Sequence, residues 1–313
     1  MSDETVGIVV GVDGSDPSKL AVQWAAQEAH VRKLPILLAA AYVVPQFLYA
    51  EGMVPSTAVF DELEGQAQTF VDEAVNEIRK VDADIDIMQE IHEGNPITML
   101  LELSKKAEMV VIGSRGLGGF AGALLGSVSS SLVHHAHGTV VIVRENMDLS
   151  AKNNRIVVGA DGSDISALAV QAAYTEAEAY GANLVAVNAW LDRAVSSSLA
   201  GVNLSDIDWE QAKEEQRKLV QQELEECKGD YHGTTPEIVI RRESPEAALA
   251  ELGDGARMIV VGSHGRGGFT GMLLGSTSRA LLRLAPVPLM VVRKPHGSKS
   301  VSYTHLRAHE TRE

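Results

Sequence analysis

The sequence predicts an α/β fold of two consecutive, doubly wound domains, each with a five-stranded parallel sheet. One observation is the length, because 313 residues suggest about two domains of ordinary size. A second is an internal repeat at an offset of 148 or 149 residues. A third is the alternation of short, wholly apolar runs with helical patterns, which indicates a parallel sheet covered on both faces.

The repeat is visible in two separate stretches. Residues 113–127, GSRGLGGFAGALLGS, return at 262–276 as GSHGRGGFTGMLLGS, with eleven of fifteen positions identical and all six glycines kept. IVVGVDGSD at 8–16 returns as IVVGADGSD at 156–164. Offsets that agree to within one residue indicate that one domain has been duplicated.

The repeat sets the expected domain boundaries. We expect a first domain at residues 1–146, a polar linker at 147–154 and a second domain at 155–295. The tail 296–313 has no counterpart after the first copy and no apolar periodicity. We therefore expect it to be disordered or vector-derived, and it takes no part in the functional argument.

Each copy has the same order of elements. An apolar strand stops at Asp-Gly-Ser, which forms turns, and an Ala-rich helix with apolar residues three and four apart follows. A second strand, an acidic amphipathic helix and a third strand come next. Asn95-Pro96 and Ser244-Pro245 then start a helix, because an N-cap residue precedes proline. MVVIG and MIVVG are buried strands that run into the glycine segments, and a fifth strand ends each copy. The expected ranges are strands 8–12 and 156–160, helices 18–32 and 166–180, strands 36–43 and 184–190, helices 61–80 and 206–228, strands 85–91 and 237–242, and last strands 140–143 and 289–292.

Two loops in each copy lie at the expected ligand-binding edge of the sheet. In a doubly wound sheet, ligands bind outside the carboxyl ends of the strands, where the strand order reverses. Asp13 and Asp161 follow the first strands and the glycine segments follow the fourth, so each pair of loops can share one crevice. Because glycine has no side chain, its backbone N–H group can point directly at an anion. The helix expected from Ser127 would add the positive end of its dipole to the same site. The alternative, that the aspartates only cap a helix, stays open.

Composition excludes several classes of function. Lys and Arg total 27 against 42 for Asp and Glu, and the formal charge of −15 opposes binding to nucleic acid or to an anionic membrane. Cys227 is the single cysteine, so there is no internal disulfide, and we expect an inert thiol. The sequence has neither a signal-peptide pattern nor an apolar run of membrane-spanning length, so we expect a cytoplasmic protein.

Familiar catalytic and nucleotide motifs fit poorly. There is no G-x-x-x-x-G-K-[ST], and the G-x-G-x-x-A pattern from Gly116 follows the fourth strand rather than the first. No serine hydrolase or zinc protease motif is present. The pair His134 and His135 lacks a second cluster at metal spacing, so we expect no metal site.

The pattern that does fit is G-x2-G-x9-G-S, which occurs once in each glycine segment. Together with GVDGS and GADGS at the first strands, it resembles the universal stress protein family in its tandem, ATP-binding, actinobacterial-like form. The resemblance covers about residues 5–294. It implies Rossmann-like domains of the adenine nucleotide alpha hydrolase-like type. It also implies two ATP molecules per chain, and it allows Mg²⁺ beside them.

The resemblance also implies a division of labour within each site. The aspartate bonds the adenine or ribose side, the end of the second strand faces the adenine, and the glycines and serine wrap the phosphates. Arg115 and His264 stand where a cation can neutralise triphosphate charge. The residues implied are, in the first repeat, Gly11, Asp13, Ala41, Val43, Gly113, Arg115, Gly116, Gly126, Ser127 and Val128, and in the second, Gly159, Asp161, Ala189, Gly262, His264, Gly265, Gly275, Ser276 and Thr277.

One departure from the family pattern precedes the fourth strands. The family commonly has Ala-Asp there, whereas this chain has Ala107-Glu108 and Ala256-Arg257, which we expect at the surface. The final strands are expected to pair, because sheet edges tend to be paired or covered. We expect this pairing to join the two repeats within the chain, and we also expect a homodimer.

Three functions remain open at this stage. The leading hypothesis is an ATP-binding regulatory protein of the stress response, in which nucleotide occupancy shifts a conformational population and hydrolysis is not required. The second is a slow ATPase or an adenylate-transferring enzyme. The third is an adaptor that binds an unidentified protein partner through its acidic helices and keeps the nucleotide as a structural element.

Overall fold

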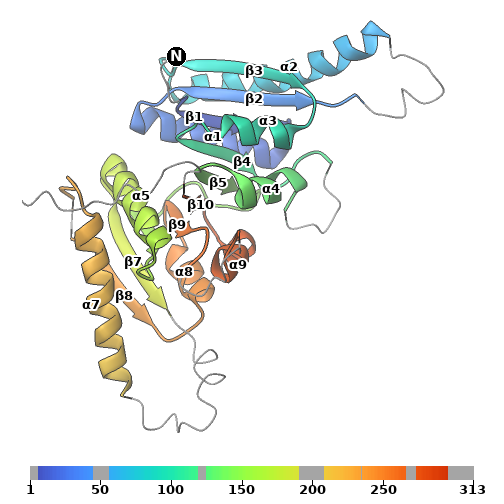
Figure 1. Cartoon of the computed structure of the whole chain (residues 1–313). Helices are drawn as coiled ribbons and strands as arrows, with labels where there is room; N and C mark the ends of the chain where they lie inside the picture. Colours follow the sequence, from blue (N-terminus) through green and yellow to red (C-terminus); the bar gives the residue numbers. More distant parts are fainter. Residues whose placement is uncertain are drawn as a thin grey trace, which may run out of the picture.

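The computed structural model describes residues 6–44, 56–118, 125–189, 208–233, 235–265 and 273–294. The ten strands in this part of the chain form one sheet in the order β3-β2-β1-β4-β5-β10-β9-β6-β7-β8. Figure 1 shows the two halves of the molecule on either side of β5 and β10. Within each half the order reverses between the first and fourth strands, which is the predicted doubly wound arrangement.

The first half follows the element order predicted from the sequence. Its described strands and helices are β1 (Ile8–Gly11), α1 (Asp16–Arg32), β2 (Ile36–Tyr42), α2 (Thr57–Val81), β3 (Ile87–Glu93), α3 (Pro96–Leu103), β4 (Met109–Gly113), α4 (Ser127–His135) and β5 (Thr139–Val143). The acidic helix is longer at its start than the pattern indicated, since α2 begins at Thr57. The helix α3 begins at the expected pair, with Asn95 as N-cap and Pro96 at N1.

The second half repeats this arrangement. Its described elements are β6 (Arg155–Gly159), α5 (Asp164–Tyr180), β7 (Asn183–Ala189), α7 (Trp209–Cys227), β8 (Glu237–Arg241), α8 (Pro245–Gly253), β9 (Met258–Gly262), α9 (Ser276–Leu284) and β10 (Leu289–Val292). The expected strand end at residue 190, the expected helix start at 206 and the tail from 296 lie outside the described residues.

The two halves join through their last strands. β5 and β10 pair antiparallel, with Leu289 opposite Ile142 and Val291 opposite Val140, whereas every other strand pair in the sheet is parallel. The predicted pairing of the repeats within the chain is therefore confirmed. Because β5 and β10 run in opposite directions, the carboxyl ends of the strands of the two halves lie at opposite edges of the sheet.

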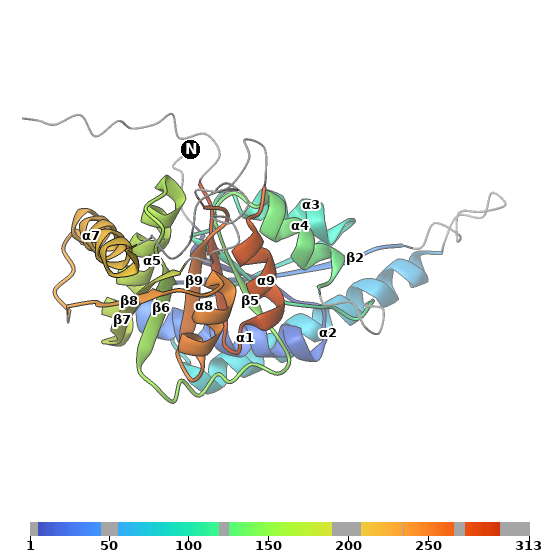
Figure 2. The same cartoon turned by 90° about the horizontal axis from the view of Figure 1, so that it is seen from below.

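Helices cover both faces of the sheet, as the continuous apolar strands predicted. One buried cluster combines one strand face with residues of α1, α2, α5 and α7, and the other combines the opposite face with α3, α4, α8 and α9. In Figure 2 α3 and α4 lie together, away from α1 and α2. Each cluster contains residues of both repeats, so the core is continuous across the β5–β10 junction.

The expectation that the dipeptides before the fourth strands lie at the surface was wrong for Ala256 and holds only in part for the other positions. Ala256 is fully buried, and Glu108 and Arg257 are only partly exposed. Glu108 and Arg257 each lie against the first helix of their own repeat, α1 and α5. Glu108 pairs with Arg32 there, and the guanidinium of Arg257 lies 4.2 Å from the ring centroid of Tyr180.

Two further expectations concern the membrane and the cysteine. No helix in the described ranges is both long enough and apolar enough to cross a membrane. Cys227 is buried at the end of α7, and its Sγ donates to the carbonyl of Ala167 at 3.5 Å. Burial raises the pKa of this thiol to about 11, which agrees with the expected inert thiol.

Candidate functional site

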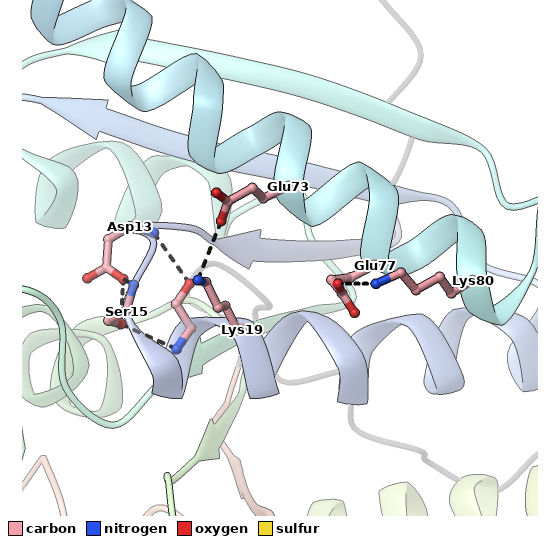
Figure 3. Close-up of polar contacts among 7 residues, drawn as sticks. Asp13, Ser15, Lys19, Glu73, Glu77 and Lys80 are labelled. Carbon is pink, nitrogen blue, oxygen red and sulfur yellow. Dashed lines mark hydrogen bonds and ion pairs between the residues drawn. The ribbon is translucent and has the colours of Figure 1, made fainter.

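The first loop of the candidate site is the turn between β1 and α1. Ser15 is the N-cap of α1, and its hydroxyl accepts from the N–H of Ser18 at 3.3 Å. Asp13 Oδ1 accepts from the N–H and the hydroxyl of Ser15, at 3.0 and 2.6 Å (Figure 3). Ser15 therefore caps α1, and Asp13 holds Ser15 in place through these two hydrogen bonds. The second repeat has Ser163 as N-cap of α5, with its N–H 3.0 Å from Asp161 Oδ1.

A serine one turn into the first helix of each repeat holds the aspartate at the strand end. The hydroxyl of Ser18 donates to the carbonyl of Gly11 at 3.2 Å and accepts from the N–H of Asp13 at 3.3 Å. Ser166 makes the same two contacts in the second repeat, with Gly159 at 3.5 Å and Asp161 at 2.9 Å. Both aspartates are therefore fixed by side chains as well as by the strand.

The glycine segment meets this turn from the other side. Asp13 Oδ2 accepts from the N–H of Leu117 at 3.3 Å, and the hydroxyl of Ser15 donates to the carbonyl of Arg115 at 3.3 Å. The residues in these contacts are about a hundred positions apart in the chain. The loops after the first and fourth strands therefore share one site, as predicted from the position of the strand-order reversal.

Gly116 and Gly265 lie directly against the aspartates. A Cβ added to Gly116 would stand 2.1 Å from Asp13 Oδ2, and one added to Gly265 would stand 2.2 Å from Asp161 Oδ2. Any side chain at these positions has to displace the carboxylate. Glycine therefore permits the close contact between the two loops.

Gly113 and Gly262 also have a packing role that the sequence did not predict. A Cβ on Gly113 would stand 2.7 Å from the backbone carbon of Pro17, and one on Gly262 would stand 2.5 Å from Ile165 Cγ2. These two glycines allow the first helix of each repeat to pack closely against the end of the fourth strand. Their packing role is sufficient to explain why glycine occurs there, although both also line the pockets.

The helices after the glycine segments point their N-termini into the site. The N-cap residues are Gly126 for α4 and Gly275 for α9, so no side chain of the N-cap residue satisfies the first-turn N–H groups. Each helix is also tied to the end of its strand. The hydroxyl of Ser129 donates to the carbonyl of Gly113 at 2.7 Å, and that of Ser278 to the carbonyl of Gly262 at 2.6 Å.

A pocket of about 270 Å³ opens between these elements in the first repeat. Nine of the ten residues that the sequence implied for this repeat line it. The exception is Val43, which is 55% exposed and is not part of the lining. It lies beyond the end of β2, where Ala41 faces the pocket instead.

The equivalent pocket of the second repeat has a volume of about 350 Å³. All nine residues implied for this repeat line it. The lining also includes Asn188, which is 6% exposed and donates to the carbonyl of Ala160 at 2.7 Å. The first repeat has Ala40 at the equivalent position, so the two pockets differ in polarity at the end of the second strand.

Sequence reasoning missed one apolar wall of each pocket. This wall comes from the third helix of each repeat, through Met99 and Leu100 in α3 and Leu249 in α8. Pro96 and Pro245, at the starts of these helices, line the pockets as well. The proline pairs had identified the helix starts, and the doubly wound topology places those starts at the same edge of the sheet. The proline pairs therefore also indicated that these helices begin at the pocket, but only the helix boundary was predicted from them.

Arg115 and His264, the two residues expected to neutralise phosphate charge, line their pockets, and each already contacts another side chain. The guanidinium of Arg115 lies 3.2 Å from the carboxylate of Glu145, and the Arg115 side chain is 37% exposed. His264 Nδ1 lies 3.1 Å from the hydroxyl of Ser263. No group of three or more His, Cys, Asp and Glu side chains among the described residues has metal-binding geometry. The centres of the glycine segments, residues 119–124 and 266–272, lie outside the described part of the chain.

Comparisons with known proteins agree with the fold. The family model "Universal stress protein family" matches residues 7–144 and 152–293. A universal stress protein of Mycobacterium tuberculosis H37Rv is 38% identical over 306 residues, which are 93% of this chain and 96% of that relative. One from Mycolicibacterium smegmatis is 36% identical over 296 residues, with 92% and 97% covered.

Two solved structures share the fold across both repeats. A universal stress protein from Archaeoglobus fulgidus superposes with a TM-score of 0.67 at 21% identity, over 93% of this chain and 99% of that one. A putative universal stress protein from Pseudomonas aeruginosa gives a TM-score of 0.58 at 14% identity, over 93% and 94%. With two matching domains and relatives of similar length, this chain belongs to the universal stress protein family.

Proposed function

We propose that each repeat binds one ATP molecule and that nucleotide occupancy, rather than turnover, is the output of the protein. The observation that supports this most strongly is the duplicated pocket at the strand-order reversal, where an aspartate is in close contact with a glycine in both repeats. The proposal treats residues 1–146 and 155–295 as separate nucleotide-binding domains joined by 147–154. It also implies a protein of the cytoplasm, where ATP is present.

The phosphate side of the proposed site is formed by the helix N-termini. The first-turn N–H groups of α4 and α9 have no capping side chain at Gly126 or Gly275, and they line the pockets. Such groups, together with the helix dipole, hold phosphate without requiring a lysine. Arg115 and His264 add one cationic or titratable side chain to each pocket, and any accompanying Mg²⁺ would bind through the phosphates.

The nucleoside side of the proposed site is formed by the strand ends and the apolar wall. Ala41 and Ala189 line the pockets at the ends of the second strands, and Leu100 and Leu249 face them from α3 and α8. Apolar walls with a few fixed polar groups are typical of small-molecule sites. A purine base fits this chemistry. The volume of about 350 Å³ falls at the lower end of the usual range for such sites, and that of about 270 Å³ lies just below it.

Binding is favoured over rapid catalysis by the contacts of the aspartate. Both carboxylate oxygens of Asp13 already accept hydrogen bonds, from Ser15 and from Leu117. A carboxylate used in this way holds two loops together and is poorly placed to activate a water molecule. Slow hydrolysis remains the alternative, and it would appear as steady phosphate release that is lost in the loop variants described next.

The test is a calorimetric titration of the full chain with ATP. We expect two ATP molecules per wild-type chain. In G116A the new methyl group displaces the Asp13 carboxylate and removes its bond to Leu117, and a hydrogen bond to a charged group contributes about 1.5–3 kcal/mol. We therefore expect affinity at the first pocket to fall by about tenfold or more, and G265A to do the same at the second.

The matched control is another glycine-to-alanine change outside the pockets. Gly65 lies exposed in α2, and a Cβ there meets no atom within 4 Å, so G65A should bind ATP as the wild type does. Absence of ATP binding to the wild type at millimolar concentration would overturn the proposal. Equal affinity of wild type, G116A and G265A would show that the nucleotide binds elsewhere.

The expected homodimer stays a prediction. The strand edges that the sequence offered for pairing, β5 and β10, are paired with each other within the chain. A dimer would therefore use a different surface, and sedimentation of the full chain with and without ATP would detect it. An unidentified protein partner is likewise a prediction, and it would be expected to bind one nucleotide state in preference to the other.

A further inference from the structure

The two pockets are connected by a pair of arginines that the proposed binding role does not use. Arg144 and Arg293 directly follow the last strands of the two repeats, and the repeat offset makes them equivalent positions. Each side chain crosses the β5–β10 junction and reaches the other repeat. The guanidinium of Arg293 donates to the carbonyls of Val133 and Ala136, at 2.6 and 3.0 Å.

These carbonyls are at the C-terminus of α4, where helix carbonyls lack partners in the helix. Arg144 makes the reciprocal contacts with the carbonyls of Arg283 and Ala285, at the C-terminus of α9. A cation at a helix C-terminus satisfies these carbonyls and complements the negative end of the dipole. Arg293 is 7% exposed, and burial lowers the pKa of both guanidinium groups.

The helices that the arginines hold are the ones that enter the pockets. The N-terminus of α4 lines the first pocket through Ser127 and Val128, and that of α9 lines the second through Ser276 and Thr277. Each helix has nine residues and therefore spans about 13 Å from its pocket to the opposite edge of the sheet. At that edge lies the pocket of the other repeat, because β5 and β10 are antiparallel.

Each arginine is also joined to the pocket of its own repeat. The carbonyl of Val292, next to Arg293, accepts from the N–H of Ser263, which lies between Gly262 and His264 of the second pocket. Arg293 additionally donates to the carbonyl of Leu273 at 3.1 Å, two residues before Gly275.

The same link exists in the first repeat. The carbonyl of Val143, next to Arg144, accepts from the N–H of Ser114 at 2.8 Å. Ser114 lies between Gly113 and Arg115, which both line the first pocket. A continuous series of hydrogen bonds and one rigid helix therefore connects the pockets in each direction.

We propose that Arg144 and Arg293 are positioning residues that couple the two pockets, so that a ligand bound in one repeat raises the affinity of the other. This inference rests on the proposed ATP binding. A ligand that contacts the described residues next to Ser114 or Ser263 fixes the adjacent arginine, and hence the position of the helix that enters the other pocket. The second ligand then meets a helix N-terminus whose position is already fixed, which gives positive coupling.

The test measures the ATP affinity of one pocket at a time by calorimetry, in chains whose other pocket is disabled. In the G265A chain, where ATP binds the first pocket, R293M should weaken binding about tenfold although Arg293 belongs to the second repeat. In the G116A chain, R144M should weaken binding at the second pocket similarly. The control is K218M, which removes an exposed cationic side chain from α7 and should leave both affinities unchanged.

A second readout is the cooperativity of ATP binding in the wild type. The affinity of the wild type for two ATP molecules should exceed the product of the two single-pocket affinities, and the double variant R144M/R293M should lose this excess. R293K, which keeps the charge but not the forked donor geometry, should retain part of it.

The outcomes distinguish this inference from the proposed function. If the wild type binds no ATP, the proposed function fails and the coupling fails with it. If ATP binds both pockets independently, and R293M binds at the first pocket as the parent chain does, the coupling alone is overturned.

Discussion

Removing Arg32 should destabilise the protein far more than removing a surface lysine. Arg32 lies at the contact of α1 with α5, and its side chain is 12% exposed. Its guanidinium pairs with Glu108, lies 3.2 Å from Glu176 Oε1 and lies 3.7 Å from Glu28 Oε1. Glu28 and Glu176 are fully buried or nearly so, at 0% and 1% exposure. The substitution R32M would leave these buried carboxyl groups without their cation.

The expected magnitude follows from the burial of the partners. Breaking a buried ion pair by removing one partner costs about 3–5 kcal/mol, because the remaining charge is desolvated and unpaired. The Glu108 contact adds little, since that side chain is 36% exposed. At about 2 °C per kcal/mol for a chain of this size, the melting temperature should fall by about 6–10 °C. The assay is thermal and urea unfolding followed by circular dichroism at pH 8.

The same cluster predicts a pH dependence with a defined sign. Burial and the nearby Glu28 raise the pKa of Glu176 well above its ordinary value of 4.5. The folded state therefore holds a proton that the unfolded state releases above about pH 4.5. The contribution of Glu176 to stability is present below that pH and is lost as the pH rises toward the raised folded pKa. The penalty of R32M should accordingly be smaller at pH 5 than at pH 8.

Two variants serve as controls for this prediction. K19M removes the surface pair of Lys19 with Glu73, whose side chains are 49% and 53% exposed, and should cost less than about 1 kcal/mol (Figure 3). E176Q imitates the protonated carboxyl, so it should flatten the pH dependence and recover much of the loss when added to R32M. A cost for R32M no larger than that of K19M, and the same at both pH values, would refute the reasoning.

Three further predictions concern single positions. G65A should raise the free energy of unfolding by about 0.5–1 kcal/mol in urea melts, because an exposed helical glycine gains helix propensity, and an unchanged midpoint would contradict this. G113A should lower the free energy of unfolding by about 1–3 kcal/mol, because its Cβ meets the backbone of Pro17 at 2.7 Å, whereas G126A, with its nearest atom at 3.5 Å, should cost less in the same melts. Cys227 should be alkylated at pH 8 about a hundredfold more slowly in the folded chain than in urea, because its pKa is raised from 9.0 to about 11, and equal rates would show an accessible thiolate.

Local patterns predicted the order of the elements and the loops that form the site. The strand ends at Asp13 and Asp161 and the glycine segments are marked by turn residues within a few positions, and the repeat confirmed each assignment independently. The doubly wound topology then placed both loops at one edge of each half. The contact of Asp13 with Leu117 was therefore foreseeable as a meeting of loops, although not as a particular hydrogen bond.

Features that depend on the contact between the repeats could not be predicted in this way. Glu28 and Glu176 are 148 residues apart, and each resembles an ordinary charged residue of an amphipathic helix. Their burial follows from the pairing of β5 with β10, which brings α1 against α5. The same pairing brings Arg144 and Arg293 to the helices of the opposite repeat, a contact that their positions at the ends of strands do not indicate in the sequence. The apolar wall from Leu100 and Leu249 was missed because a helix-start signal does not indicate which residues of the next turn face a pocket.

The most direct test of the central claim is native mass spectrometry of the full chain in the presence of ATP. We expect complexes with one and two ATP molecules in the wild type, and at a limiting ATP concentration we expect predominantly one in G116A and in G265A. cAMP, which lacks the β- and γ-phosphates that the helix N-termini would hold, should compete weakly. A chain that remains free of nucleotide at millimolar ATP, or that binds two ATP molecules with both glycines substituted, would contradict the proposal that each repeat binds ATP through its aspartate and glycine loops.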